Sequence, residues 1–253
     1  MPDLVTRLRA AGCVFAEEEA ALLTEAAGSP DELETLVRRR VAGEPLEYVV
    51  GWVAFDGGRV VLDPGVFVPR QRTAYLVEVA APTLTAHSVV VDLCCGSGAI
   101  GLALARRHPG LRVHAADVDP IAVACAARNL APVGGTAVAG DLDAPLPAAL
   151  RGQVDAIVAN VPYVPTDAVA LMPPESREHE PRGTVDGGSD GLDVFRRVAA
   201  LAPRWLRPGG MVYSEVSEAQ APLAAAVLGA AGLTPRVHHD DERETTVITG
   251  AAS

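Results

Sequence analysis

Apolar residues recur at helical spacing through the first part of the chain and predict three short helices. Their expected ranges are 4–11, 16–27 and 29–42, and each range is followed by a glycine. The segment Ser29–Glu32 supports the third helix, because it offers an N-cap serine, a proline at the first helical position and a glutamate three residues after the cap. Helices this short bury little apolar surface alone, so we expect a small N-terminal helical domain over residues 1–45 that leans on the main domain or on a partner.

Residues that favour β-structure replace the helical pattern between Tyr48 and Val68. This run is broken at Asp56-Gly57-Gly58, and an Asp-Gly pair between two apolar runs is a strong signal for a tight hairpin turn. We therefore expect a β-hairpin linker over residues 46–72, between the N-terminal helices and the rest of the chain.

From residue 73 onward, short apolar strands alternate with amphipathic helices. The expected strands are 88–93, 111–116, 136–139, 154–159, 211–216, 236–239 and 244–249. The expected helices are 99–107, 120–130, 191–206 and 218–231, with a turn at Pro208-Gly209-Gly210. Strands that alternate with helices indicate an α/β domain, here 73–253, with a doubly wound, mainly parallel sheet covered on both faces. The long stretch 165–191 fits neither pattern and is expected to be a lid or a substrate-facing loop.

Composition narrows the class of protein. The chain has 253 residues, 49% of them apolar, and a formal charge of −11, which argues against a broad electrostatic contact with nucleic acid. No run of 18 or more apolar residues occurs and the first residues are not a secretory signal, so we expect a cytoplasmic protein that does not enter a membrane. The four cysteines lack the spacing of a zinc site, and we expect no metal centre and no disulfide. No lysine occurs in the chain, so a catalytic lysine is excluded.

A glycine loop follows the first strand of the α/β domain. Residues Gly96–Gly101 match the dinucleotide-binding pattern, and Asp117 at the end of the next strand can hold a ribose diol. These features suit a nicotinamide dinucleotide and S-adenosylmethionine equally. Asp92 favours the second, because a carboxylate beside the loop suits the ammonium of a cationic cofactor and would repel a pyrophosphate.

A second motif, Asn160-Val161-Pro162-Tyr163, stands at the carboxyl end of the strand 154–159. An amide nitrogen is a poor nucleophile, since its lone pair is delocalised. The side-chain oxygen of Asn160 and the carbonyl of Val161 could accept its two N–H bonds and favour a pyramidal nitrogen. Pro162 holds Val161 extended, and Tyr163 offers a flat face for a planar group. The motif predicts methyl transfer to an amide or amino nitrogen, with no titrating base required.

At these residues the sequence resembles the HemK/PrmC family, the protein-(glutamine-N5) methyltransferases that modify the Gly-Gly-Gln motif of peptide chain release factors. The resemblance is carried by residues 45–51, by Val68-Pro69-Arg70 with Thr73 and Leu76-Val77, by 91–101, by Asp117, by Asn160–Tyr163, by Glu180-Pro181 and by 186–192. The chain departs from the family pattern at three places, one of which is a short helical N-terminal part. The chain also has Asn-Val-Pro-Tyr instead of Asn-Pro-Pro-Tyr, and Arg72 stands where an acid is usual.

The resemblance implies a seven-stranded, Rossmann-like methyltransferase sheet, S-adenosylmethionine as cofactor and a release factor as protein substrate. Asp92 is an expected cofactor contact from the argument above. The resemblance places further cofactor contacts at Cys94, Cys95, Gly96, Ser97, Gly98, Asp117, Asp141, Leu142 and Asn160. It places the catalytic and substrate contacts at Asn160, Val161, Pro162 and Tyr163. Arg70 is a candidate to position Asn160 or the substrate, and equally a surface arginine that packs after Pro69.

Other functions fit parts of the same pattern. A paralogue could methylate another protein or a small-molecule amide, which the departures at Val161 and Arg72 motivate. An adenine-N6 nucleic-acid methyltransferase also uses a planar amino group, although the charge of −11 argues against it. A binding module that keeps the cofactor without turnover is disfavoured by the intact Asn160, Pro162 and Tyr163. The pattern does not indicate an oligomeric state.

Overall fold

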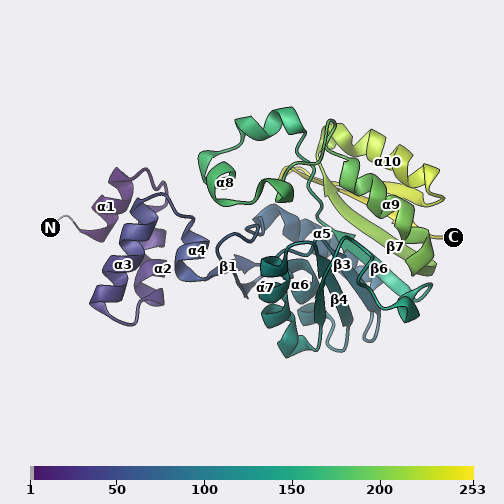
Figure 1. Ribbon diagram of the computed structural model, residues 1–253, viewed down its shortest axis with the longest axis horizontal. Coiled ribbons are helices and arrows are strands. Elements are labelled where there is room, and N and C mark those ends of the chain that lie inside the picture. The colour runs from purple at the N-terminus through teal and green to yellow at the C-terminus, as the bar shows by residue number, and fades with distance from the viewer. Residues whose placement is uncertain (1–2) are drawn as a thin grey trace.

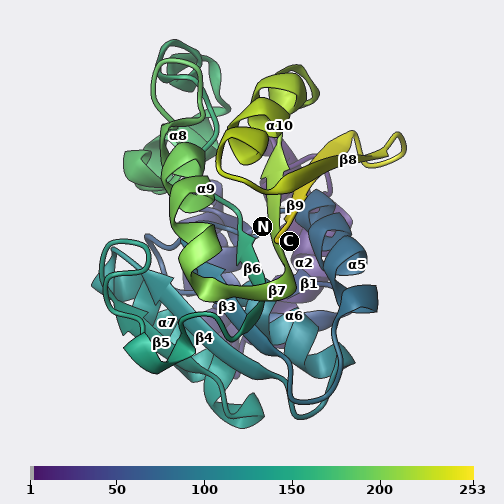
Figure 2. The ribbon, with the colours of Figure 1, turned by 90° about the vertical axis from the view of Figure 1, so that its right-hand side faces the viewer.

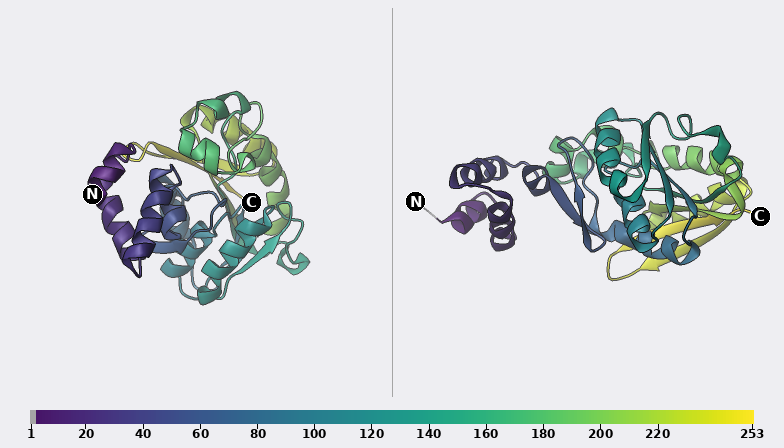
Figure 3. Two further views of the ribbon diagram at one scale, coloured as in Figure 1. Left: turned by 60° about the vertical axis from the view of Figure 1, so that its left-hand side comes forward. Right: turned by 90° about the horizontal axis from the view of Figure 1, so that it is seen from below.

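Helices at the N-terminal end enclose an apolar cluster of their own. The computed structural model describes residues 3–253, apart from the side chains of residues 174 and 175. The helices are α1 (Leu4–Ala10), α2 (Ala16–Ala26), α3 (Pro30–Val41) and α4 (Leu46–Val50). Their shared cluster includes Leu8, Leu23 and Val37. Figure 3 shows that these helices project from one end of the molecule, away from the C-terminus.

The start of α3 differs in one detail from the expected capping box. The Ser29 side chain accepts a hydrogen bond from the Glu32 backbone N–H, at 3.2 Å, as expected. The Glu32 carboxylate, however, accepts from the backbone N–H of Gly28, at 2.8 Å. The glutamate therefore caps the residue before the serine, because the chain turns back at Gly28.

The hairpin that follows has the predicted turn. Strands β1 (Trp52–Phe55) and β2 (Gly58–Val61) pair antiparallel, with Phe55 opposite Gly58. The turn residues Asp56 and Gly57 both have positive φ, 48° and 75°, which matches the right-handed twist of the strands. The residues just before the hairpin were wrongly expected to be β-structure, since Tyr48–Val50 lie in helix α4.

In the described part of the chain, seven strands form one sheet in the order β5-β4-β3-β6-β7-β9-β8. The strands are β3 (Val89–Leu93), β4 (Arg112–Asp117), β5 (Thr136–Ala139), β6 (Val154–Ala159), β7 (Leu206–Val216), β8 (Thr234–Asp240) and β9 (Thr245–Ala251). All neighbours pair parallel except β9, which runs antiparallel to β7 and β8. The predicted doubly wound, mainly parallel sheet is confirmed.

Helices cover both faces of this sheet (Figure 2). One face packs against α5 (Ala74–Ala80), α6 (Ala99–Arg107) and α7 (Pro120–Leu130), and the other against α9 (Asp193–Trp205) and α10 (Ala221–Ala230). Strand β3 shows why helices are needed on both faces of the sheet. Val90 packs into the first cluster, and Val91 and Leu93 pack into the second, because successive strand side chains point to opposite faces.

Two predicted boundaries on this sheet were wrong. The expected turn at residues 208–210 lies inside β7, which begins at Leu206. The strand continues through Pro208 because its register against β6 shifts there and Gly209 takes a φ of 74°. The last expected helix begins later, at Ala221, after the single turn η7 (Glu218–Gln220).

The stretch 165–191 is built from short helical turns. They are η5 (Thr166–Leu171), α8 (Pro174–His179) and η6 (Arg182–Thr184). In Figure 1 this segment lies above the sheet, between the N-terminal helices and α9. Elsewhere, η1 (Gln71–Thr73), η2 (Ala81–Thr83), η3 (Ala131–Val133) and η4 (Ala148–Leu150) are single turns that join longer elements. No helix among residues 3–253 is long and apolar enough to cross a membrane.

Candidate active site

A cavity of about 290 Å³ opens where the parallel strands β3, β4 and β6 end. Besides Phe55, its lining residues come from within 65–73, 94–100, 117–122, 160–164 and 172–185. The register explains the meeting point. Leu93 on β3 pairs with Ala116 on one side and with Ala159 on the other, so the residues that follow these strands leave the sheet at one level. Open α/β sheets bind ligands at this edge, where the strand order reverses.

The glycine loop borders this cavity with its backbone. Gly96 and Gly98 have φ of 54° and 75°, and a Cβ on Gly96 would meet no atom within 4 Å. A Cβ on Gly98 would lie 3.1 Å from the Cβ of Ala126, so a side chain at this position would prevent the loop from packing closely against α7. Cys94, Cys95, Gly96 and Ser97 line the cavity, and Gly98 closes the turn by donating to the Cys95 carbonyl at 2.7 Å. The loop can therefore admit a ligand into close backbone contact.

Asp117, the last residue of β4, lines the cavity beside this loop. One carboxylate oxygen accepts from the Gly96 N–H at 2.9 Å, and the other accepts from the Asp119 N–H at 3.0 Å. A carboxylate has about four lone-pair sites, so lone pairs remain on both oxygens for a diol. The next residue, Val118, is 74% exposed and also lines the cavity, where it offers an apolar face that the sequence reasoning missed.

Asp92 lies beneath the loop and does not line the cavity. One oxygen accepts from the Gly101 N–H at 2.9 Å, and the other has no hydrogen-bond partner among the described residues. Burial raises the pKa of its carboxyl to about 8. In this structure the carboxyl holds the first turn of α6, and its contact with a ligand ammonium stays a prediction.

Asp141 and Leu142 also lie outside the cavity lining. Asp141 forms an ion pair with Arg197 at 2.6 Å, and Leu142 is buried with a φ of 49°. Their expected contacts with the cofactor stay predictions. The thiols of Cys94 and Cys95 belong to the loop, and burial raises the pKa of Cys94 to about 12, so it remains a thiol.

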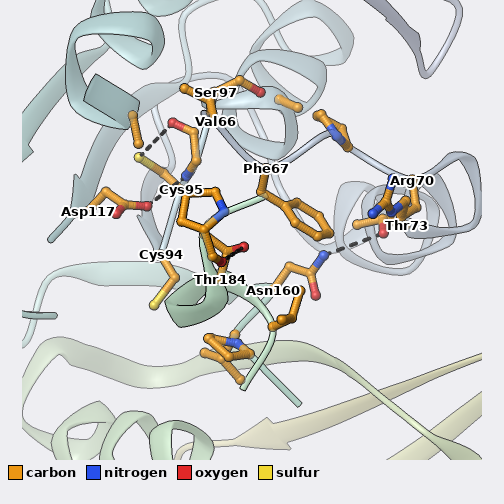
Figure 4. A pocket seen from close by; sticks show the side chains of 18 of the residues that line it. Val66, Phe67, Arg70, Thr73, Cys94, Cys95, Ser97, Asp117, Asn160 and Thr184 are labelled. Carbon is orange, nitrogen blue, oxygen red and sulfur yellow. Dashed lines mark hydrogen bonds between the residues drawn. The ribbon is translucent and has the colours of Figure 1, made fainter. Parts of the chain in front are cut away.

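Asn160 leaves the sheet just after β6, opposite the glycine loop. Figure 4 shows Asn160 and Thr73 on one side of the cavity, with Cys94, Cys95 and Asp117 on the other. The Asn160 side-chain amide donates to the Thr73 hydroxyl at 3.5 Å, the long end of the hydrogen-bond range. Within the described chain, nothing donates to the Asn160 side-chain oxygen or to the Val161 carbonyl. Both residues line the cavity.

Tyr163 is held by two polar partners. Its hydroxyl donates to Glu215 at 2.9 Å and accepts from Arg72 at 2.7 Å. Burial raises the pKa of this hydroxyl, and the Glu215 charge adds to the effect, so the phenol stays protonated. Thr73 and Glu215 were both missed as site residues. The sequence signal for Glu215 was an acid inside the expected strand 211–216, and the structure shows that this acid is buried.

Arg70 faces the segment 165–191. It forms an ion pair with Glu180 at 2.6 Å and lies 4.8 Å from the ring centre of Phe67. The Glu180 side chain is only 2% exposed, and it also accepts a hydrogen bond from the Val68 N–H at 3.1 Å. The pair fastens the segment, whose Thr184 and Val185 form one wall of the cavity.

The glycines of residues 186–192 fit against the backbone of the Asn160–Tyr163 motif. Gly187 donates to the Val164 carbonyl at 2.8 Å, and a Cβ there would lie 2.6 Å from the Pro162 carbonyl oxygen. A Cβ on Gly191 would lie 2.2 Å from the Tyr163 carbonyl oxygen. Only glycine allows this approach, so the loop braces the motif from behind.

Comparison with known proteins identifies the family. The Methyltransferase small domain matches residues 57–172. The release factor glutamine methyltransferase of Geobacter sulfurreducens is 40% identical over 198 residues, which are 76% of this chain and 69% of that protein. That of Gloeobacter violaceus is 38% identical over 205 residues (78% and 71%), and that of Mycolicibacterium smegmatis is 43% identical over 179 residues (70% and 63%).

Among solved structures, the T. thermophilus 16S rRNA N2 G1207 methyltransferase, in complex with AdoMet and guanosine, superposes with a TM-score of 0.58. It is 23% identical and is covered over 50% of its length, against 80% of this chain. A methyltransferase from Pyrococcus furiosus reaches 0.57 at 16% identity, covering 76% of this chain and 87% of that one. These likenesses concern the fold alone.

Fold and family together define a class I methyltransferase. Within that class, the chain belongs to the release factor glutamine methyltransferase family, as its identity to curated members over most of both chains shows.

The raised pKa of Asp92 predicts a pH-dependent stability. Between its ordinary value of 3.8 and about 8, the folded state keeps a proton that the unfolded chain has released. The free energy of unfolding should therefore fall as the pH rises through this window, by up to about 1.4 kcal/mol per pH unit. Asp92→Asn should remove that component. Urea unfolding at several pH values measures it, with the exposed Asp167→Asn as control. Equal slopes for wild type and Asp92→Asn would contradict the prediction.

The close packing at Gly191 predicts that one added methyl group lowers the free energy of unfolding strongly. Gly191→Ala should lower the free energy of unfolding by roughly 1–3 kcal/mol more than Gly232→Ala. The two glycines have similar φ, 78° and 82°, but a Cβ on Gly232 would meet no atom within 4 Å. The difference between them isolates the clash from the backbone strain. Denaturant unfolding of both variants tests this, and equal losses would show that the close contacts of Gly191 with the Tyr163 carbonyl and the Gln220 side chain are unimportant.

Proposed function

We propose that this chain transfers a methyl group from S-adenosylmethionine to the side-chain amide nitrogen of a glutamine in a peptide chain release factor. The observation that carries the proposal is the pair of free acceptors at the end of β6. The Asn160 side-chain oxygen and the Val161 carbonyl have no donor in the described chain, and both residues line the cavity that the glycine loop borders.

The cavity residues fit the cofactor by their chemistry. The bare backbone at Gly96 allows close approach, and Asp117 keeps lone pairs for the ribose hydroxyls. Val118 supplies an apolar surface for a base. When bound, the sulfonium cofactor supplies an activated methyl group whose leaving group is a neutral thioether. Cys94, Cys95 and Ser97 complete the wall on this side, and Asp141 and Leu142 do not line it.

The opposite wall prepares the amide. A primary amide presents two N–H bonds, and Asn160 and Val161 offer one acceptor to each. Acceptors aimed at both bonds favour the pyramidal nitrogen that can receive a methyl group. Pro162 and Tyr163 support this geometry, Tyr163 as a flat surface whose hydroxyl is already engaged by Arg72 and Glu215. No side chain needs to remove a proton before transfer, because the nitrogen releases one of its two protons to solvent after the carbon–sulfur bond has broken and the carbon–nitrogen bond has formed.

The segment 165–191 excludes water from the reacting groups. Met172, Thr184 and Val185 line the cavity, and Arg70 fastens the segment through Glu180. A site closed to water strengthens the polar contacts that orient the amide. Arg70 thus contributes by holding this wall beside the substrate.

The substrate is proposed from the family. The curated relatives are named release factor glutamine methyltransferases, and a glutamine side chain suits the acceptor pair at Asn160 and Val161. The formal charge of −11 favours a protein partner over nucleic acid. Because release factors act in translation, we place the chain in the cytoplasm.

Labelled methyl transfer tests the proposal. Wild type should label a purified release factor, and a factor whose Gly-Gly-Gln glutamine is replaced should stay unlabelled. Asn160→Ala should lower kcat about 100-fold or more, while the Kd for S-adenosylmethionine changes less than about tenfold, because the lost acceptor acts mainly in the transition state.

Gln153→Ala is the control variant. Gln153 is exposed and lies outside the cavity lining, so this variant should transfer the methyl group at the wild-type rate. Label that persists after replacement of the glutamine, or after Asn160→Ala at the wild-type rate, would refute the assignment.

A further inference from the structure

A buried carboxylate lies behind the motif Asn160–Tyr163. Glu215, near the end of β7, is 2% exposed and does not line the cavity that the glycine loop borders. It accepts hydrogen bonds from the Thr73 hydroxyl at 2.6 Å, from the Tyr163 hydroxyl at 2.9 Å and from the Arg72 guanidinium at 3.0 Å. Residues 72 and 73 belong to the short turn η1, so this carboxylate, on β7, joins the turn to the segment that follows β6.

The direction of these hydrogen bonds determines how Asn160 lies. A carboxylate accepts and does not donate, so the single hydroxyl proton of Thr73 goes to Glu215. The Thr73 oxygen then has only lone pairs to offer to its other neighbour. It faces the Asn160 side chain at 3.5 Å and must meet the amide nitrogen, not the oxygen. The Asn160 oxygen is thereby turned away from Thr73.

The same carboxylate orders Tyr163. The phenol proton goes to Glu215, and the phenol oxygen accepts from Arg72 at 2.7 Å. Arg72 contacts both groups, so it supplies the positive charge that a buried carboxylate requires. The two ends of the Asn160–Tyr163 motif are therefore fixed by one anion.

We propose that Glu215 is a positioning residue for methyl transfer, acting through Thr73 to present the Asn160 side-chain oxygen to the reacting amide and through Tyr163 to hold the adjoining surface. The inference rests on the proposed function. Nothing in the described chain other than Thr73 contacts the Asn160 side-chain amide by a hydrogen bond, so no second contact would preserve the orientation.

Two substitutions of nearly unchanged shape test the relay. Glu215→Gln places an amide that can donate to Thr73, which frees the Thr73 hydroxyl to donate to Asn160 and reverses the amide. Thr73→Val removes the hydroxyl altogether. Each should lower the single-turnover rate at saturating substrates by about 10-fold or more. The Kd for S-adenosylmethionine and the KM for release factor should stay within about threefold of wild type, since neither side chain is a substrate contact in this scheme.

Two further variants separate positioning from structure. Thr73→Ser keeps the hydroxyl and should restore the rate to within about threefold of wild type. Thr245→Val is the matched control, because Thr245 is a buried threonine on the neighbouring strand β9 whose hydroxyl has no partner in the described chain. It should leave the rate unchanged. Rates of folded Glu215→Gln and Thr73→Val within about twofold of wild type would overturn the inference, as would a loss in Thr73→Val that Thr73→Ser shares.

A spectroscopic readout keeps this inference separate from the proposed function. The side-chain amide signals of Asn160, identified in asparagine-labelled protein by their loss in Asn160→Ala, should shift in Glu215→Gln and in Thr73→Val. They should stay in place in Thr73→Ser and Thr245→Val. Failure of wild type to label a release factor would refute the substrate alone. Unmoved Asn160 signals in both relay variants would refute the positioning role whatever the substrate.

Discussion

The parallel pairing of β3 with β4 and β6 is the constraint on which the rest of this molecule depends. Leu93 is aligned with Ala116 and with Ala159, so Cys94, Asp117 and Asn160 lie at one level at the edge of the sheet. No single strand carries a site. The site exists because backbone hydrogen bonds hold three strand ends at one level. The helices α6, α7 and α9 bury the sheet, and this burial keeps the strand pairing in place.

Around that edge, the structure divides the work between backbone and side chains. The glycine-loop side of the cavity is mostly backbone, since Gly96 and Gly98 keep the loop open and Asp117 holds it from beside the cavity. The Asn160 side of the cavity is held by contacts from distant parts of the chain. The glycines at 187 and 191 press on the motif from behind, and Glu215 gathers Thr73, Tyr163 and Arg72. Arg72, a departure from the family pattern, is thus part of the packing of this motif.

Much of the fold was predictable because local patterns agree with the tertiary arrangement. The hairpin turn at Asp56-Gly57, the glycine loop and the parallel strands each have a local cause in the sequence. The errors fell where tertiary contacts override local preference. Pro208 and Gly209 signal a turn, but they lie in β7 between Leu206 and Met211, which both pair with β6, and the Gly209 N–H donates to the Ala252 carbonyl at 3.1 Å. Tyr48 favours a strand, yet lies in α4, where its hydroxyl donates to the Val66 carbonyl at 2.6 Å.

The sequence by itself determined the class of fold, the glycine loop with its acid, and the Asn160–Tyr163 motif, because each is a short pattern whose chemistry is local. Only the tertiary structure decided which side chains surround these patterns. Glu215 lies 55 residues beyond Asn160, and Thr73 lies 87 residues before it, as the numbering shows. Hydrogen bonds between such distant residues follow from strand order and register, which no local pattern specifies. The same is true of Asp92, whose burial beneath the loop is a product of packing.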